Sequence, residues 1–461
     1  MDENKEMQSD GSDGSDGVFE AQPLPQLQGE GPPPPPNGGA QAWLQVLGAH
    51  LLFFNSWGII NTFGAYQAFY EQNLLSTHNS SQISWIGTFQ GFLLVSDDLA
   101  NPERHSRAPS YSEACANSSS RVVFSFVAGP IFDQGYFRTL IITGTVLVVF
   151  GIMMTSLATQ YWQLFLAQGV VTGLGAGCLF LPSIAIVATY FTTKRAIATG
   201  ITAAGGSVGS VVYPVVFHKL QPQIGFAWAT RIIGFIALAT LIVSILIMKT
   251  RLPPPEKSRR MFDTAALRSL PYMVFNIGLF FAFVGLYIPF FYAIIYAERQ
   301  LGIKEDLSFY MLAVLNGASV FGRILPGLLA DRFGSIEVIT VASLISAVIA
   351  FCWLAVNNLG GLVVFCIIYG FISGAVVSLP PTVIAGFAPG LHLVGTWIGM
   401  SFCFAAMGFL IGNPIAGTII NIAEKKFSGG IIFSASCTAA GAASFVLAGA
   451  LKIRASRAAK Q

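Results

Sequence analysis

The hydrophobic residues of this chain fall into long runs without charge, and this pattern predicts membrane-spanning helices. No Asp, Glu, Lys or Arg occurs between Thr139 and Thr193, or between Val338 and Ala423. A helix that crosses the hydrocarbon core of a bilayer needs about 20 predominantly apolar residues. The first run, 55 residues long, is therefore predicted to hold two spans, and the second, 86 residues long, to hold three.

The same reasoning along the whole chain predicts twelve spans, six on each side of a basic connector at 249–270. In the first half, 43–248, they are 43–70, a divided span of 83–95 and 122–132, 139–158, 162–189, 196–217 and 228–248. In the second half, 271–451, they are 271–297, 307–329, 338–356, 362–383, 394–420 and 430–451. The expected fold class is an all-α polytopic membrane protein of two six-helix halves.

The divided second span contains a segment that cannot cross a bilayer. Residues 96–121 are rich in Ser, Asn and Pro and hold seven charges. Without them, 83–95 and 122–132 join into one span of ordinary length. We interpret 96–121 as an insert that is foreign to the fold, and a retained intron is our hypothesis for its origin.

Composition and residue spacing exclude an ordinary soluble enzyme. Charged residues make up 10% of the chain, whereas soluble domains carry about 25%. No two histidines lie at the i, i+4 spacing of helical zinc sites, and no Cys-x-x-Cys spacing occurs. We therefore expect no catalytic residue, no metal and no cofactor. The basic balance of the spans and loops fits anionic lipid and implies no nucleic-acid partner.

The distribution of Lys and Arg predicts that both chain ends lie in the cytoplasm. With this orientation the cytoplasmic loops hold fourteen Lys and Arg and the opposite loops six, as the positive-inside rule requires. Residues 1–42 form an acidic, proline-rich tail that we expect to be disordered, and 452–461 form a short cytoplasmic tail. We expect the plasma membrane, with the vacuolar membrane as the alternative. An N-glycosylation sequon begins at Asn79 in the first outer loop.

A short motif that recurs six spans apart points to a transporter. Gly129 and Asp133 lie at the end of the second span, and Gly327 and Asp331, with Arg332 next, lie at the end of the eighth at the same spacing. Two related six-helix halves are typical of transporters that rock between two states. We expect the glycines to let helices approach and the acids to pair with a basic group or a helix N-terminus in one state. The alternative is that both acids are solvated loop charges.

Two further segments carry more specific patterns. The first, before span one, is Asn37-Gly-Gly-x-x-x-Trp43, and the second covers 190–209. They resemble the opening and the fifth-span signature of the monocarboxylate transporter family, within the major facilitator superfamily, and are closest to its fungal branch. The matching residues are Gly38, Gly39, Trp43, Tyr190, Phe191, Lys194, Arg195, Gly200, Gly205 and Gly209. The resemblance covers 37–451 and implies the major facilitator fold, while Asn37 replaces the family's usual acid.

The resemblance implies transport of monocarboxylates, riboflavin or secondary metabolites, but the family's lactate machinery is incomplete here. Ser319 replaces the acid four residues before the arginine of span eight, and span one contains no Lys. No Asp or Glu lies well inside a span, so the sequence names no proton relay, and proton coupling and oligomeric state stay open.

The predicted function is a secondary transporter that moves a small organic solute, an organic acid or a secondary metabolite, by alternating access. Alternatives are an uptake carrier for a nutrient or vitamin and a nutrient receptor derived from a transporter. The aromatic residues of span seven, including Tyr287, suit a flat organic substrate better than lactate.

Polar residues inside the spans are the candidates for substrate contact. Arg323 lies about 12 Å along its helix from the cytoplasmic end of span eight, and buried cations in spans are usually functional. We expect it to dock a carboxylate of the substrate. The alternative is a salt bridge or a carbonyl cap near the cytoplasmic gate. Asn61, Asn276 and Asn316 can face the same cavity or join neighbouring helices.

Overall fold

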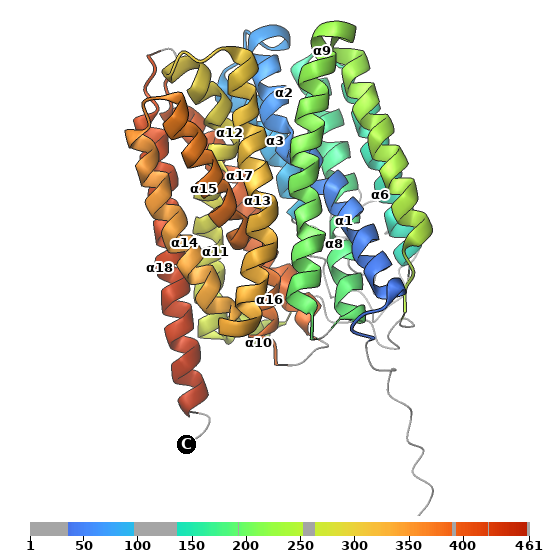
Figure 1. Ribbon diagram of the computed structural model, residues 1–461, viewed down its shortest axis with the longest axis vertical. Coiled ribbons are helices and arrows are strands. Elements are labelled where there is room, and N and C mark those ends of the chain that lie inside the picture. Colours follow the sequence, from blue (N-terminus) through green and yellow to red (C-terminus); the bar gives the residue numbers. More distant parts are fainter. Residues whose placement is uncertain are drawn as a thin grey trace, which may run out of the picture. The chain divides into compact units, whose positions relative to one another are not determined.

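The structure is a computed structural model that describes residues 36–95, 136–191, 193–251, 263–389, 393–422 and 424–458. The chain is helical throughout these ranges (Figure 1). Their only β-structure is one isolated bridge between Asn421 and Lys426. Most of the acidic tail, the 96–121 insert, and Gly129 and Asp133 lie outside the described residues.

The first half has a helix at each predicted span that falls within the described ranges. Span one consists of α1 (Ala40–Asn61), α2 (Phe63–Phe69) and a π-helical turn, Tyr70–Leu74; α3 (Ser80–Val95) begins span two. Span three is α6 (Phe137–Thr155), and span four joins α7 (Tyr161–Leu164), a π-helical stretch, Phe165–Val171, and α8 (Thr172–Tyr190). Spans five and six are the arms of α9 (Arg195–Ile247), which turns back at Gly225, where φ is +79°. Glycine adopts this backbone without steric cost.

The second half follows a short connector helix, α10 (Thr264–Arg268). Span seven consists of α11 (Leu270–Leu286), α12 (Ile288–Ile295) and a π-helical turn, Tyr296–Gln300. Spans eight and nine are α13 (Glu305–Phe333) and α14 (Ser335–Cys352), the latter extended by a 3₁₀ turn, Trp353–Ala355. Span ten consists of α15 (Leu359–Ser378) and α16 (Pro380–Ala385), and α17 (Val394–Ile419) and α18 (Ser428–Ala458) complete the bundle.

Ten helical segments within the described ranges are long and apolar enough to cross a membrane. One of them, α9, provides two crossings, and α3 provides the described part of another. The prediction of an all-α protein with twelve spans is therefore confirmed. The end of α18 lies beyond its predicted boundary, since the helix continues to Ala458 through Lys452, Arg454 and Arg457. Basic side chains are favourable at a helix C-terminus, so the helix extends past the apolar segment.

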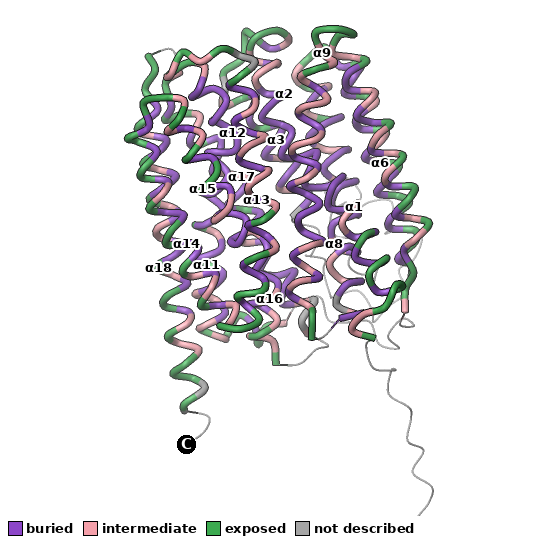
Figure 2. Tube along the Cα trace, in the orientation of Figure 1, coloured by how far each residue is buried: buried purple, intermediate pink, exposed green. Residues whose placement is uncertain are grey.

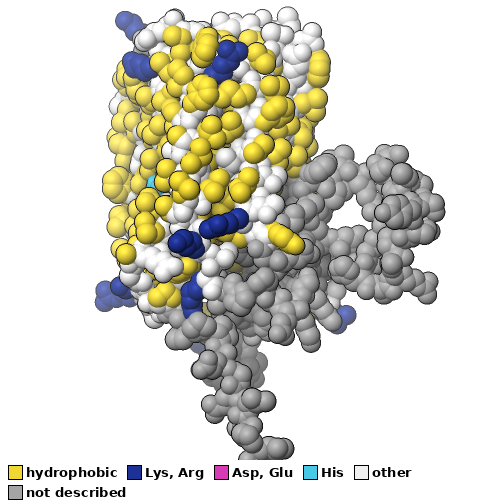
Figure 3. Space-filling model, turned by 90° about the vertical axis from the view of Figure 1, so that its right-hand side faces the viewer, with side chains coloured by type: hydrophobic (Ala, Val, Ile, Leu, Met, Phe, Trp, Pro, Cys, Tyr) yellow, Lys and Arg dark blue, Asp and Glu magenta, His cyan; other side chains and the backbone are white. Residues whose placement is uncertain are grey.

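Burial separates the inner and outer faces of the bundle. In Figure 2 the buried positions follow the inward sides of the helices, and exposed positions lie on the outward sides. The outward positions include large apolar side chains such as Val146, Leu246 and Val348. Figure 3 shows apolar side chains over the middle of one face, with Lys and Arg toward its two ends. This is the expected distribution for a surface that contacts a bilayer.

Two long helix pairs join the halves: α9 packs against α13, and α3 packs against α17. Within the first pair, the Ser207 hydroxyl donates to the Ser319 hydroxyl at 3.3 Å. Eleven residues further along α9, the His218 ring stacks on Phe309 with centroids 4.2 Å apart. Any solute that crosses between the halves must therefore separate surfaces that are in contact in this conformation.

The first span of each half is broken near its middle in the same manner. Thr62 separates α1 from α2, and Tyr287 separates α11 from α12. Both spans then end in a five-residue π-helical turn. Broken helices near the level of the substrate are typical of transporters built from repeated halves, and the shared break extends the internal repeat seen in the sequence.

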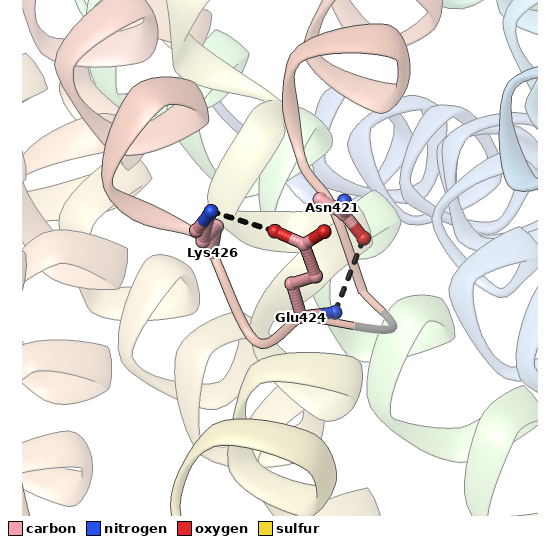
Figure 4. A network of polar contacts seen from close by, with 3 residues as sticks. All are labelled: Asn421, Glu424 and Lys426. Carbon is pink, nitrogen blue, oxygen red and sulfur yellow. Dashed lines mark hydrogen bonds and ion pairs between the residues drawn. The ribbon is translucent and has the colours of Figure 1, made fainter.

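A short polar turn joins α17 to α18 (Figure 4). The side-chain oxygen Oδ1 of Asn421 accepts a hydrogen bond from the Glu424 backbone N–H at 3.1 Å, and the Glu424 carboxylate pairs with Lys426 at 2.6 Å. The Glu424 and Lys426 side chains are both more than half exposed. Exposed ion pairs contribute about 0–1 kcal/mol, so the turn directs the chain without stabilising the bundle substantially.

Glycines set the distance between α13 and α15. A Cβ added at Gly322 would lie 1.9 Å from the Phe371 carbonyl oxygen, and one added at Gly370 would lie 2.1 Å from that of Leu315. No side chain fits at such distances, so both positions require glycine in this packing. Close approach through small residues is a common basis of helix association in membranes.

We expect Gly322→Ala to lower thermal stability, because α13 and α15 must move apart and lose dispersion contacts. The apparent melting temperature of the purified protein in detergent, measured by scanning fluorimetry, should fall by about 3 °C or more. Gly317→Ala on the same helix is the matched control, since nothing lies within 4 Å of an added Cβ there. Equal melting temperatures for the two variants would contradict the packing argument.

Candidate substrate site

The candidate site is centred on Arg323, which is 2% exposed on α13. Its Nη1 donates to the carbonyl oxygen of Ala203 on α9 at 2.8 Å, so this hydrogen bond joins the two halves. Within the described part of the chain, Arg323 Nε has no hydrogen-bond partner, and no carboxylate lies within ion-pair distance of the guanidinium. In this conformation Arg323 therefore binds a backbone carbonyl and leaves donor capacity unused.

An aromatic pair lies beside Arg323, with one ring from each half. Trp57 on α1 stacks on Tyr287 with 5.9 Å between ring centroids and 16° between ring planes. Gly206 on α9 leaves room for both neighbours: a Cβ added there would lie 2.7 Å from Trp57 Cβ and 3.3 Å from Arg323 Nη1. The three side chains thus form one cluster between the halves.

Each member of this cluster buries a polar atom that has no hydrogen-bond partner among the described residues. The atoms are Nε1 of Trp57, Oη of Tyr287 and Nε of Arg323. All three can donate a hydrogen bond. An unpartnered buried donor costs about 1–3 kcal/mol, so the cluster favours a ligand that brings acceptor oxygens between the halves.

Two of the three predicted asparagines lie near the cluster along their helices. Asn61 is one turn beyond Trp57, and its amide donates to Ser210 Oγ at 3.0 Å. Asn316 is two turns before Arg323, and its amide donates to the Leu312 carbonyl at 3.0 Å. In both, Oδ1 is buried without a partner in the described chain. Asn276 is also buried, but it lies about 16 Å along its helix from Tyr287, outside the cluster.

A small cavity of about 20 Å³ adjoins the aromatic pair. Its lining comes from both halves and includes Phe53, Trp57, Phe180, Ala203, Phe283, Ser378 and Phe402. This volume holds about one water molecule, whereas sites for organic ligands occupy about 300–1,000 Å³. The conformation is therefore closed at this level, and binding of a substrate requires the halves to part. Larger hollows, of about 310 and 370 Å³, lie on the outward apolar faces.

The predicted gating residues of the second half lie at one end of α13. A Cβ added at Gly327 would lie 3.2 Å from the Ala196 carbonyl oxygen, so α13 and α9 approach each other closely at this glycine. Asp331 and Arg332 are exposed, and the Arg332 guanidinium lies over the Phe333 ring. Asp331 makes no ion pair with any residue that the structure describes. The pairing role of the acid therefore stays a prediction.

The two segments that resemble family signatures contact each other. The Asn37 backbone N–H donates to the Tyr190 carbonyl at 3.1 Å, and its Oδ1 accepts from the Thr193 N–H at 3.0 Å. The Trp43 and Phe191 rings pack with centroids 5.2 Å apart. An asparagine oxygen accepts a hydrogen bond as a carboxylate oxygen would, so an acid at position 37 could accept the same bond from the Thr193 N–H.

The glycines of these two segments have two structural roles. One allows a backbone turn, and the others allow neighbouring helices to pack closely. Gly39 has a φ of +84° directly before α1. A Cβ added at Gly205 or Gly209 would lie 2.0 or 2.3 Å from a carbonyl oxygen of α1, and one added at Gly200 would lie 2.8 Å from the Arg323 carbonyl oxygen. The segment therefore packs span five against span one and against the other half at the level of the site.

Sequence reasoning did not single out Trp57. The available signal was its position as the one tryptophan in the interior of span one, because Trp43 lies at the start of that span. Its partner Tyr287 belonged to the aromatic residues predicted to suit a flat substrate, and Pro289, which follows it directly in α12, marked the break that positions it.

Residues 114–413 match the family model described as Major Facilitator Superfamily. The chain belongs to the Major Facilitator Superfamily. It is therefore a membrane transporter and not an enzyme, as predicted from the sequence. This match identifies the superfamily. It does not assign the chain to the monocarboxylate transporter family, which the two signatures resemble.

Fungal relatives include transporters and efflux proteins. The MFS-type transporter dbaD of Emericella nidulans is 38% identical over 385 residues, 84% of this chain and 80% of the relative. The aspyridones efflux protein apdF of the same organism is 38% identical over 84% of this chain and 74% of its own length. The agnestins efflux protein AgnL12 of Paecilomyces divaricatus is 35% identical over 84% and 83%.

A solved structure shares the fold of this transporter. The Escherichia coli fucose:proton symporter FucP matches with a TM-score of 0.61 over 89% of this chain and 99% of FucP, at 16% sequence identity. At this level of identity the likeness concerns the arrangement of helices.

We expect Gly200→Val to part the halves at the level of the site, because the added Cβ would lie 2.8 Å from the Arg323 carbonyl oxygen. The measurement is maleimide labelling of a cysteine placed at Ser319, which is 1% exposed, read by mass spectrometry of that peptide. The labelling rate should rise about tenfold if the lost contact contributes about 1.4 kcal/mol. Gly449→Val, where the nearest atom would lie at 3.8 Å, is the control. An unchanged rate in the Gly200 variant would refute the expectation.

Proposed function

We propose that this transporter exports an organic anion, an acidic secondary metabolite, and that Arg323 docks the anion's carboxylate. The supporting observation is a buried arginine between the halves with no carboxylate beside it among the described residues. A charged side chain at the bilayer centre costs at least about 2.5–3.5 kcal/mol, and a hydrogen bond to a charged group contributes about 1.5–3 kcal/mol. One bond to Ala203 roughly offsets this minimum cost and leaves the remaining donors for a ligand.

The hydrogen bond between Arg323 and Ala203 links anion binding to the movement of the halves. In the closed conformation Nη1 is occupied by the carbonyl oxygen on α9. When α9 and α13 part at this level, the bond breaks and Nη1 becomes free for a carboxylate. The closed state is stabilised by the bond between Arg323 and Ala203, and the open state by the bond between Arg323 and the anion. The anion therefore binds the open state more tightly than the closed one, as a population shift requires.

The names of two relatives, the aspyridones and agnestins efflux proteins, support export of a secondary metabolite over uptake of a nutrient. The two signatures that meet at Asn37 and Tyr190 support assignment to the fungal branch of the monocarboxylate transporter family. Within that assignment, Asn61 and Asn316 would offer their unpartnered Oδ1 atoms to donors on the substrate. Asn276 would contact it further along the path.

The proposed location is the plasma membrane with both ends in the cytoplasm. The start of α1 and the end of α18 lie at the same end of the bundle (Figure 1), as this orientation requires. Asn79 is exposed just before α3, at the position of the outer sequon. At the cytoplasmic end, Gly327, Asp331 and Arg332 would form the gate of the second half, and we propose the same role in the first half for Gly129 and Asp133.

Arg323→Gln in proteoliposomes tests the proposal. The vesicles are loaded with naphthalene-2,6-dicarboxylate, a fluorescent dianion, and its protein-dependent efflux is followed after dilution. Gln removes the charge, so we expect efflux to fall at least about tenfold. Arg323→Lys keeps the charge but loses the planar fork, so it should retain an intermediate rate.

Arg299→Gln, which removes an exposed arginine outside the cluster, is the control and should transport at the wild-type rate. Wild-type efflux by Arg323→Gln at matched protein content would overturn anion docking. Flux of the dianion toward the cytoplasmic side, and not away from it, would favour the uptake carrier, and binding without flux would favour the receptor.

A further inference from the structure

We propose that Trp57 and Tyr287 form a clamp for a planar conjugated ring system, so that the transported anion is a planar aromatic acid and not an aliphatic one. The inference rests on the proposed transport of an organic anion and adds a ring-binding element to the carboxylate site at Arg323. The planar part of the substrate enters between the two rings when the halves part.

The geometry of the pair suits this role. The ring planes are 16° from parallel with centroids 5.9 Å apart, so the two π faces oppose each other. Because Trp57 belongs to α1 and Tyr287 to the break between α11 and α12, parting the halves separates the rings. A flat conjugated ligand can stack on both faces, whereas a saturated ring of the same size cannot.

The backbone around Tyr287 is held firmly enough to present its ring. Pro289 lies at the start of α12 and contributes no backbone N–H, which leaves carbonyls near the break without helical partners. The Gly285 carbonyl accepts from Ser434 Oγ at 2.8 Å, and the Leu286 carbonyl accepts from the Tyr369 hydroxyl at 2.9 Å. Because other helices satisfy these groups, the break is a fixed part of the fold.

The ring edges also carry donors. Nε1 of Trp57 and Oη of Tyr287 are buried and have no partner among the described residues. A conjugated acid with ring oxygens, such as phenol, quinone or pyrone oxygens, supplies acceptors for both while its carboxylate reaches Arg323. This combination of stacking and acceptor oxygens defines the substrate class more narrowly than the carboxylate alone.

A second tryptophan shows which feature distinguishes the clamp. Trp353 is also buried, stacks on Phe365 with centroids 5.1 Å apart, and has an unpartnered Nε1 among the described residues. Both of its rings belong to the second half, at the 3₁₀ turn and α15. A stacked tryptophan by itself is therefore a packing feature, and only the pair at Trp57 is both shared between halves and adjacent to a buried cation.

The test compares two dianions with the same carbon skeleton and carboxylate positions, one flat and aromatic and the other saturated: naphthalene-2,6-dicarboxylate and decahydronaphthalene-2,6-dicarboxylate. Their Kd values are measured by calorimetry on the full chain in nanodiscs. The wild type should bind the planar dianion at least about tenfold more tightly. Trp57→Leu and Tyr287→Leu should remove most of this preference, because they weaken binding of the planar dianion more than binding of the saturated one.

Conservative variants and a matched control separate recognition from folding. Trp57→Phe and Tyr287→Phe keep a ring and should keep most of the preference for the planar probe. Trp353→Leu should keep the full preference even where it lowers the melting temperature. Arg323→Gln should weaken both probes by the same factor, because both carry the same carboxylates.

Two results would overturn the clamp. One is equal affinity of the wild type for both probes, or no binding of the planar one. The other is that Trp57→Leu and Tyr287→Leu weaken both probes equally, which would make the pair a packing contact. If Arg323→Gln weakens both probes while the leucine variants leave the preference unchanged, the clamp is wrong and anion docking stands. If instead the leucine variants lose the preference while Arg323→Gln leaves both affinities unchanged, the clamp stands and anion docking is wrong.

Discussion

A guanidinium buried between two rigid halves, with no carboxylate beside it in the described chain, constrains its whole surroundings. Arg323 is accommodated because Gly200 and Gly206 of α9 leave no side chain where its backbone and Nη1 lie. Its carbonyl oxygen accepts from Ser378 Oγ at 3.4 Å, and its Nη1 donates to Ala203. Replacing either glycine by a larger residue would push α9 from α13, so the small residues of the fifth span serve the buried charge as well as helix packing.

The first span of each half contains a helix break, but the two breaks have different surroundings. Thr62, at the break of span one, donates its hydroxyl to the Gly58 carbonyl at 2.7 Å and so satisfies the break locally. Tyr287, at the break of span seven, extends its ring across to Trp57, and hydroxyls from α15 and α18 satisfy the carbonyls behind it. One break is thus satisfied within its own helix, and the other places an aromatic side chain between the halves.

Most of the fold could be predicted because the bilayer disfavours a charged side chain at every position of a span. Each span therefore appears in the sequence as a run without charge. The end of α18 was less visible, since a helix continues through Lys452 and Arg454 once it leaves the apolar region. Arg323 could be named as a candidate because a lone charge in an apolar run is conspicuous. Trp57 could not, because its proposed role depends on a ring from a helix more than two hundred residues away, and tertiary contacts of that kind leave no periodicity in the sequence.

The two contacts that a substrate would use are also contacts that hold the closed state together. In the proposed mechanism, a carboxylate on Arg323 would replace the bond to Ala203, and a planar ring between Trp57 and Tyr287 would replace their mutual stacking. Net affinity is therefore the difference between new and lost interactions, each of about 0.5–3 kcal/mol. Such a site binds modestly but couples binding strongly to opening. Tight binding would trap the solute, so a carrier that must release its cargo on the other side gains from this exchange of contacts.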